Sequence, residues 1–228
     1  MREDVIKLLK DGLIVACQAE EHEPLHGAHF MAAMAKSAQI GGAVGIRASG
    51  LLDISAVRLA VNLPIIGSQR LDTPGFLVRI TPTLDSARQI AAAGADIIAV
   101  DATNRPHPDG LSISERIKAI HRETGRCVLA DIASFDEGLA AEAAGADAVA
   151  TTLSGYIHTA QLSLDPDFKL IAQLANRLKI PVIAEGRFTT PDQAAHALDL
   201  GAFTVVVGSP ITRPQWITAQ FVNRLKNI

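Results

Sequence analysis

The sequence has few cysteines, few aromatic residues and no long apolar run. Its two cysteines, Cys17 and Cys127, are too few for a disulfide framework or a zinc cluster. No apolar stretch approaches the ~20 residues of a membrane-spanning helix, and Met1–Lys10 indicates a charged helix rather than a secretory signal. We therefore expect a cytoplasmic protein that does not associate with membranes.

The chain also has no large excess of either acidic or basic residues. With 21 basic and 24 acidic residues, the net charge of -3 gives no electrostatic reason to expect binding to nucleic acid or to an anionic membrane. The histidines do not fall at the spacing of a metal site, so no metal is expected. Hydrophobic residues make up 48% of the chain and aromatics only 4%, so a sizeable core must be built from Ala, Val, Ile and Leu.

Eight short apolar runs alternate along the chain with amphipathic stretches of helical length. The runs are continuously apolar, which is typical of strands buried on both faces of a parallel sheet. The runs are residues 13–17, 43–46, 64–67, 97–100, 127–130, 148–151, 181–184 and 204–207. The amphipathic stretches are 26–39, 51–61, 84–93, 112–124, 134–144, 166–178, 190–200 and 214–226. This pattern predicts one (β/α)8 barrel domain over residues 1–228 with a short N-terminal helix; an open doubly wound sheet is the alternative.

Three junctions between a predicted helix and the next strand are alike. Each carries a glycine, Gly94, Gly145 or Gly201, followed by alanine. We expect these glycines to adopt the left-handed backbone conformation that ends a helix. On the last predicted helix, Ile217, Phe221 and Leu225 form an apolar stripe that we expect to face the core. Trp216, at its edge, is expected in the core or at a subunit contact.

Polar residues follow nearly every apolar run, whereas the runs themselves contain almost none. In a (β/α)8 barrel the carboxyl ends of the strands surround the active site. We therefore expect one mouth to be ringed by Gln18, Arg47, residues 68–70, Asp101, Asp131, Thr152, residues 185–187, Gly208 and Ser209.

Glu185 is the best candidate for acid/base chemistry. It ends an apolar strand, and burial there disfavours the ionised carboxylate and brings its pKa toward neutral pH. The alternative is a carboxylate that is only paired with Arg47 or Arg187. Of Asp101 and Asp131, which follow other strands, we expect one to orient hydroxyls or arginines rather than to move protons.

Two glycine turns suggest a phosphate site. Gly186–Arg187 follows the seventh apolar run and Gly208–Ser209 follows the eighth. Glycines at these positions let backbone N–H groups approach a phosphate, and Arg187 or Arg213 would add a charge-assisted contact. The alternative is a pair of ordinary glycine turns.

Motifs along nearly the whole chain resemble those of the N-acetylmannosamine-6-phosphate 2-epimerases, also called N-acylglucosamine-6-phosphate 2-epimerases. The set, in this order, is specific although no single motif is. The matching segments are LIVACQ at 13–18, GAVGIR at 42–47, PIIG at 64–67, ITPT at 80–83, IAVDAT at 98–103, ADI at 130–132, TTLSGY at 151–156, VIAEGR at 182–187 and VVGSPITRP at 206–214.

The resemblance implies a (β/α)8 barrel that interconverts N-acetylmannosamine 6-phosphate and N-acetylglucosamine 6-phosphate in sialic acid breakdown, with no cofactor or metal. Glu185 would be an acid/base residue. The other implied contacts are Gln18, Arg47, Asp131 and Arg213 to the substrate, and Gly186, Arg187, Gly208 and Ser209 to its phosphate. Barrels of this type commonly pair through outer helices, so a homodimer is an open alternative to a monomer.

The chain departs from the family at one position. The family pattern has a lysine after Pro-Ile-Ile-Gly, taken as the second proton-transfer residue, and here Arg70 stands at that position, or Gln69 if the alignment slips by one. No lysine occurs between Lys36 and Lys118. Arginine stays protonated and is a poor base, but it could stabilise an enolate by its charge. We therefore expect the fold and the ligand to be kept, with the mechanism altered or slowed.

Three functions agree with these observations. The first is an active sugar-phosphate 2-epimerase. The second is a barrel of the same family that acts on a different phosphorylated sugar. The third, suggested by the replaced lysine, is a sugar-phosphate binding protein without catalytic activity.

Overall fold

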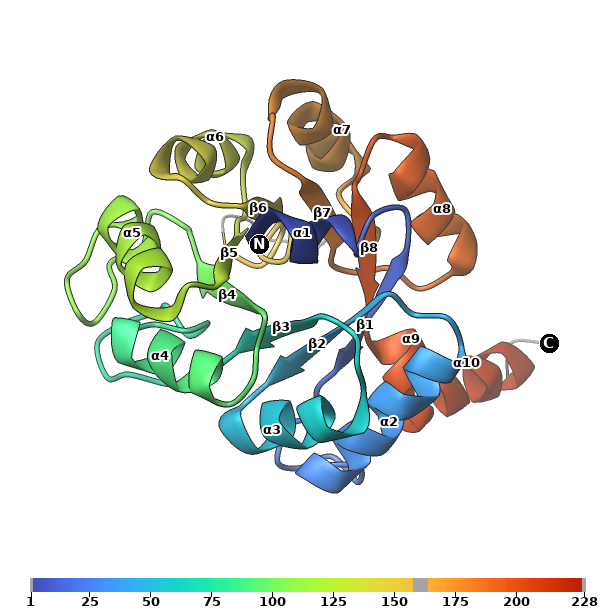
Figure 1. Ribbon diagram of the computed structural model, residues 1–228. Coiled ribbons are helices and arrows are strands. Elements are labelled where there is room, and N and C mark those ends of the chain that lie inside the picture. The colour runs from blue at the N-terminus through green and yellow to red at the C-terminus, as the bar shows by residue number, and fades with distance from the viewer. Residues whose placement is uncertain (1, 158–163, 227–228) are drawn as a thin grey trace.

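The structure, a computed structural model, describes residues 2–157 and 164–226 as a closed barrel of eight parallel strands surrounded by helices (Figure 1). Each strand pairs with its neighbours in the sequence, and β1 closes the barrel against β8. The strands are β1 Leu13–Cys17, β2 Gly45–Ser49, β3 Ile65–Ser68, β4 Ile97–Asp101, β5 Cys127–Asp131, β6 Ala148–Ala150, β7 Val182–Glu185 and β8 Thr204–Val207. The predicted (β/α)8 barrel is confirmed, and the open sheet is wrong.

Helices α2 to α8 form an outer ring in which each helix follows a strand in sequence, whereas α1 precedes β1 and lies across one end of the barrel (Figure 1). Their positions agree with the amphipathic stretches, but the short helix after β8 was not predicted. The helices are α1 Arg2–Lys7, α2 Ala28–Ile40, α3 Leu51–Ala60, α4 Leu84–Ala92, α5 Ile113–Thr124, α6 Phe135–Ala144, α7 Phe168–Arg177, α8 Pro191–Asp199, α9 Ser209–Thr212 and α10 Pro214–Lys226. That the domain extends over all of 1–228 stays a prediction.

The second strand lies later in the chain than predicted. Its apolar run suggested residues 43–46, but β2 runs from Gly45 to Ser49. Arg47 therefore lies inside the strand and not after it. A hydrophobicity pattern misses this because a buried arginine looks like a strand end, although here its charge is matched by partners across the barrel.

Side chains alternate between two buried layers. Ile46 and Ala48 of β2 pack outward against the helices. A smaller inner layer, which includes Ile66, Leu129 and Val206, fills the barrel, and Leu9 joins it from the segment after α1. A Cβ on Gly45 would lie 2.6 Å from a methyl carbon of Leu9. Glycine at this position therefore makes room for Leu9, which fills the N-terminal end of the barrel.

The predicted glycine junctions are confirmed. Gly94, Gly145 and Gly201 have φ angles of 109°, 93° and 97°, a region that side chains with a Cβ avoid. Each glycine directs the chain from a helix into the next strand, which keeps these connections short.

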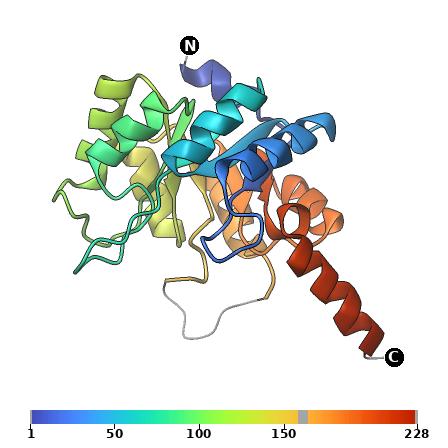
Figure 2. The same ribbon diagram turned by 90° about the horizontal axis from the view of Figure 1, so that it is seen from below.

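The expectation that the apolar stripe of the last helix faces the core is wrong, whereas a subunit contact for Trp216 stays a prediction. Phe221 and Leu225 are exposed, and Ile217 and Trp216 are only partly buried. Figure 2 shows the reason, because α10 points away from the barrel instead of lying against it. An apolar stripe at helical spacing shows that a helix has an apolar face, but not that this face packs against the rest of the chain.

In the part of the chain that the structure describes, no helix is long and apolar enough to cross a membrane.

We predict that Gly67→Ala destabilises the barrel. A Cβ on this β3 residue would lie 2.6 Å from both the Ala95 Cβ and the Ile90 Cγ2, and such overpacking costs about 1–3 kcal/mol. Gly41→Ala is the matched control, because Gly41 has φ −73° and its nearest neighbour would be a carbonyl oxygen at 3.4 Å. Urea unfolding should show a lower midpoint for Gly67→Ala alone; equal midpoints for the two variants would contradict the packing argument.

Candidate active site

The inward residues at the carboxyl ends of the strands are polar, in contrast to the apolar layer below them. On β5, the inward-facing residues Cys127 and Leu129 belong to the inner apolar layer, and the next inward-facing residue is Asp131. The same alternation places Asp101 above Ala99 on β4 and Glu185 above Ile183 on β7. The predicted polar ring at one mouth therefore follows from strand alternation alone.

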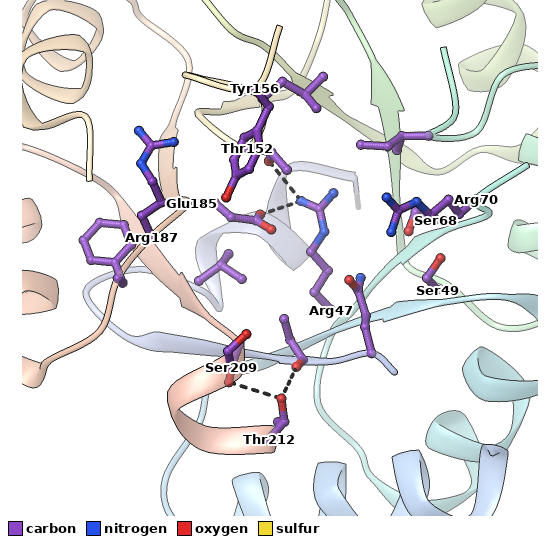
Figure 3. Close-up of a pocket in the computed structure, with 18 of the residues that line it drawn as sticks. Arg47, Ser49, Ser68, Arg70, Thr152, Tyr156, Glu185, Arg187, Ser209 and Thr212 are labelled. Atoms are coloured by element: carbon purple, nitrogen blue, oxygen red, sulfur yellow. Dashed lines mark hydrogen bonds and ion pairs between the residues drawn. The ribbon is translucent and has the colours of Figure 1, made fainter. Parts of the chain in front are cut away.

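Arg47 is the centre of this ring (Figure 3). Its guanidinium group donates two hydrogen bonds to Asp131, with Nη1–Oδ1 at 3.1 Å and Nη2–Oδ2 at 2.5 Å, and Nη1 is also 2.5 Å from Oε2 of Glu185. Thr152, just after β6, donates to Asp131 Oδ1 at 2.7 Å. Arg47 is 2% exposed and Asp131 is fully buried, so each charge depends on the other for its solvation.

Burial raises the pKa of the Glu185 carboxyl to about 7. The positive charge of Arg47 acts in the opposite direction, and the negative charge of Asp131 adds to the rise. The Glu185 side chain is 15% exposed and lines the pocket. Glu185 thus pairs with Arg47, as the alternative expected, and its role as an acid/base residue stays a prediction.

A pocket of about 1040 Å³ opens above this cluster. Most of the residues predicted for the site line it, including Gln18, Arg70 and Gly186, as do Arg187, Gly208, Ser209 and Arg213. Asp131 is not among the described residues that line it, because it lies beneath Arg47; its direct contact with a substrate stays a prediction.

Arginine is the only basic residue type among the described residues that line the pocket. Among the described lining residues there are six arginines, three carboxylates and no lysine. The arginines are Arg47, Arg70, Arg79, Arg105, Arg187 and Arg213. Guanidinium groups are suited to bind a phosphate or carboxylate, but five of these six already pair with carboxylates of the protein. The pairs are Arg47 with Asp131 and Glu185, Arg70 with Glu20, Arg79 with Asp72, Arg105 with Asp101, and Arg213 with Glu23.

The two glycine turns lie side by side at the ends of the paired strands β7 and β8. Gly186 has φ 113° and Arg187, a non-glycine residue, has φ 61°, a strained backbone of the kind found at functional sites. The Arg187 side chain donates to the carbonyl of Asp165 at 2.7 Å and lies 5.5 Å from the Tyr156 ring centre. Arg213 reaches Ser209 Oγ at 3.3 Å.

Several residues of the site were not singled out from the sequence. Arg105 lies in the pocket, where its Nη2 is 2.5 Å from Asp101 Oδ2 and its Nε donates to Thr103 at 3.0 Å. Asp101 and Asp131 therefore both orient arginines. Glu20 and Glu23, in the loop after β1, pair with Arg70 and Arg213. The three glutamates at positions 20, 21 and 23, a few residues after a strand, were the signal that could have found them.

Within residues 2–157 and 164–226, no group of three or more histidine, cysteine or acidic side chains is arranged to hold a metal ion. Cys17 and Cys127 are buried and are not joined in a disulfide, and burial raises the pKa of Cys17 to about 12. Neither cysteine resembles an activated nucleophile.

Removing the central guanidinium should destabilise the protein strongly. We predict that Arg47→Met costs about 3–5 kcal/mol, because it leaves the Asp131 carboxylate buried without its cation. Arg70→Met is the control: its ion pair is half exposed and should contribute at most about 1 kcal/mol. Denaturant unfolding of both variants measures the difference, and similar losses would show that Arg47 and Asp131 are not a buried charge pair in solution.

The chain is similar to known proteins of one family over nearly its whole length. Residues 31–227 match the family model NanE, described as "Putative N-acetylmannosamine-6-phosphate epimerase". A protein of Caldanaerobacter subterraneus named "Putative N-acetylmannosamine-6-phosphate 2-epimerase" is 47% identical over 99% of this chain and 96% of its own length. One of Cutibacterium acnes with the same name is 46% identical over 97% of each chain.

A solved structure agrees as well. The N-acetylmannosamine-6-phosphate 2-epimerase of Clostridium perfringens superimposes with a TM-score of 0.92 and 43% identity, covering 96% of this chain and 95% of the other. Together with the site just described, these matches over nearly the whole length show that the chain belongs to the N-acetylmannosamine-6-phosphate 2-epimerase family.

Proposed function

We propose that this protein interconverts N-acetylmannosamine 6-phosphate and N-acetylglucosamine 6-phosphate by moving the proton on C2, a reaction of amino-sugar and sialic acid breakdown. The observation that carries the proposal is a carboxyl, Glu185, with a pKa of about 7 at the mouth of an arginine-rich pocket. Family membership at 43–47% identity supports the choice of substrate.

The two ends of the substrate would meet different parts of the pocket. The phosphate would bind at Gly186–Arg187 and Gly208–Ser209, where two adjacent strands end in open turns, and Arg213 would add charge. The sugar chain would extend over Arg47, with Gln18 as a further contact. Asp131 would act through Arg47 and Thr152, which it holds in place.

Glu185 would remove the C2 proton of the open-chain aldehyde, and a positive charge must then stabilise the enolate oxygen. Arg70 would supply it as a fixed cation, since arginine does not act as a base. Protonated Glu185 would return the proton to the opposite face after the planar intermediate turns in the pocket. Assistance from a hydroxyl of the substrate is the alternative route for the return step.

We further propose that the protein works in the cytoplasm, which the two free thiols favour, and that its only required partner is the sugar phosphate. A homodimer would use an outer helix, and the exposed apolar residues Phe221 and Leu225 make α10 the first candidate.

Incubation with N-acetylmannosamine 6-phosphate in deuterium oxide tests the reaction directly. We expect NMR to show deuterium at C2 together with the epimer. Tight binding without exchange would support the non-catalytic alternative, and no binding would point to another sugar phosphate. Glu185→Gln should lower the rate at least ~10²-fold, because the amide cannot accept the proton; a variant with full activity would remove Glu185 from its role.

The rate should depend on the ionisation of Glu185. The base is the carboxylate, and its pKa is about 7, so kcat should rise with pH through about 7 and fall about tenfold per unit below it. Asp131→Asn should move this acidic limb of the pH–rate profile to lower pH, since the charge of Asp131 raises the pKa of Glu185. The phosphate of the substrate also titrates near pH 6, but Asp131→Asn leaves the ligand's own pKa unchanged. A limb at the same pH in both proteins would exclude Glu185 as its source.

A further inference from the structure

Arg70 lines the pocket from a backbone that is firmly held. It comes two residues after β3 and bridges to Ile80 of the antiparallel segment that follows. Leu71 N–H donates to the Arg79 carbonyl at 3.0 Å, and Thr81 N–H donates to the Gln69 carbonyl at 2.8 Å. These bonds fix where the side chain begins. They do not fix where the guanidinium group ends, because the arginine side chain is long and 50% exposed.

Glu20 supplies the missing constraint. Its Oε1 lies 2.5 Å from Arg70 Nη1. Glu20 is itself held, because its backbone N–H donates to Glu23 Oε2 at 2.8 Å. Glu23 Oε1 in turn accepts from Arg213 Nε at 3.0 Å and from Gln215 Nε2 at 2.8 Å. A chain of polar contacts therefore runs from the start of α10 through the loop after β1 to Arg70.

Arg70 lines the same pocket as Glu185, the candidate acid/base residue. In Figure 3, Arg70 and Glu185 lie on opposite sides of Arg47. A group that stays protonated in this place cannot carry a proton away. It can only act by its charge, and a charge acts best when its position is fixed before the reaction. Since half-exposed ion pairs add little to stability, the Glu20–Arg70 pair can be broken without unfolding the barrel.

We propose that Glu20 is a positioning residue that holds the Arg70 guanidinium over the pocket, where it meets the negative charge that develops on the substrate. The proposal rests on the proposed function for the substrate, but the Glu20–Arg70 geometry does not depend on it. Glu20 acts here only through Arg70 and touches no reacting atom.

The kinetic test compares Glu20→Gln with Glu21→Gln, the exposed neighbouring carboxylate. We expect Glu20→Gln to lower kcat about tenfold, less than the roughly hundredfold cost of deleting a preorganised charge donor itself. KM should stay within about twofold, because the lost interaction is made in the transition state. Thermal unfolding should not change. Equal kcat values for the two variants, or a rise in KM alone, would overturn the proposal.

A double-mutant cycle shows whether Glu20 acts through Arg70. In an Arg70→Met background, Glu20→Gln should have no further effect on kcat. A second loss of similar size in that background would show that Glu20 has a separate role, and the proposal would be wrong.

NMR of the arginine side chains in ¹⁵N-arginine-labelled protein tests the contact between Glu20 and Arg70 without measuring activity. Arg70→Met assigns the signal. In the wild-type protein without substrate, the Arg70 Nη groups should show restricted rotation, which Glu20→Gln should release and Glu21→Gln should not. If the wild-type protein shows this restriction but no reaction with the sugar phosphate, the proposed function fails and the holding of Arg70 by Glu20 stands. Free rotation in the wild-type protein would refute the holding itself.

Discussion

A guanidinium group buried inside a barrel can exist only if negative charge surrounds it, and this constraint organises the site. Arg47 is almost inaccessible to water, so its charge must be balanced by Asp131 and Glu185. Asp131 takes the bidentate contact, and Thr152 donates to one of its oxygens. Burial raises the pKa of Glu185, the shared Arg47 cation lowers it and the charge of Asp131 raises it, so that the pKa is about 7.

The barrel makes this arrangement by a division between its two ends. At the N-terminal ends of the strands the inner layer is apolar, and Leu9 of the segment after α1 closes this end of the barrel. At the carboxyl ends of the strands, the next inward-facing residue on several strands is charged. Each polar group is thus carried by a strand whose lower half is packed in the core, so its backbone has little freedom. The loops that follow the strands then add residues such as Glu20 and Arg70, whose side-chain geometry depends on polar contacts rather than on packing.

The sequence alone predicted much of this and missed the rest for physical reasons. Strand ends are local features, so the mouth at Asp101, Asp131 and Glu185 could be predicted from the apolar runs that precede them. Partners across the barrel are not local: the distance in sequence from Arg47 to Asp131 hid their pairing, and a charged residue within β2 shifted its predicted bounds. The exposure of Phe221 on α10 could not be predicted either, because periodicity does not show how a helix is oriented.

The choice of guanidinium over ammonium groups around the pocket has a chemical consequence. An open-chain sugar is an aldehyde, and a neutral amine condenses with aldehydes to give an imine. Among the described residues that line the pocket there is no lysine to do this, while its arginines offer charge without a nucleophilic nitrogen. A cavity built this way can hold a reactive carbonyl compound for as long as the reaction takes without becoming glycated by it.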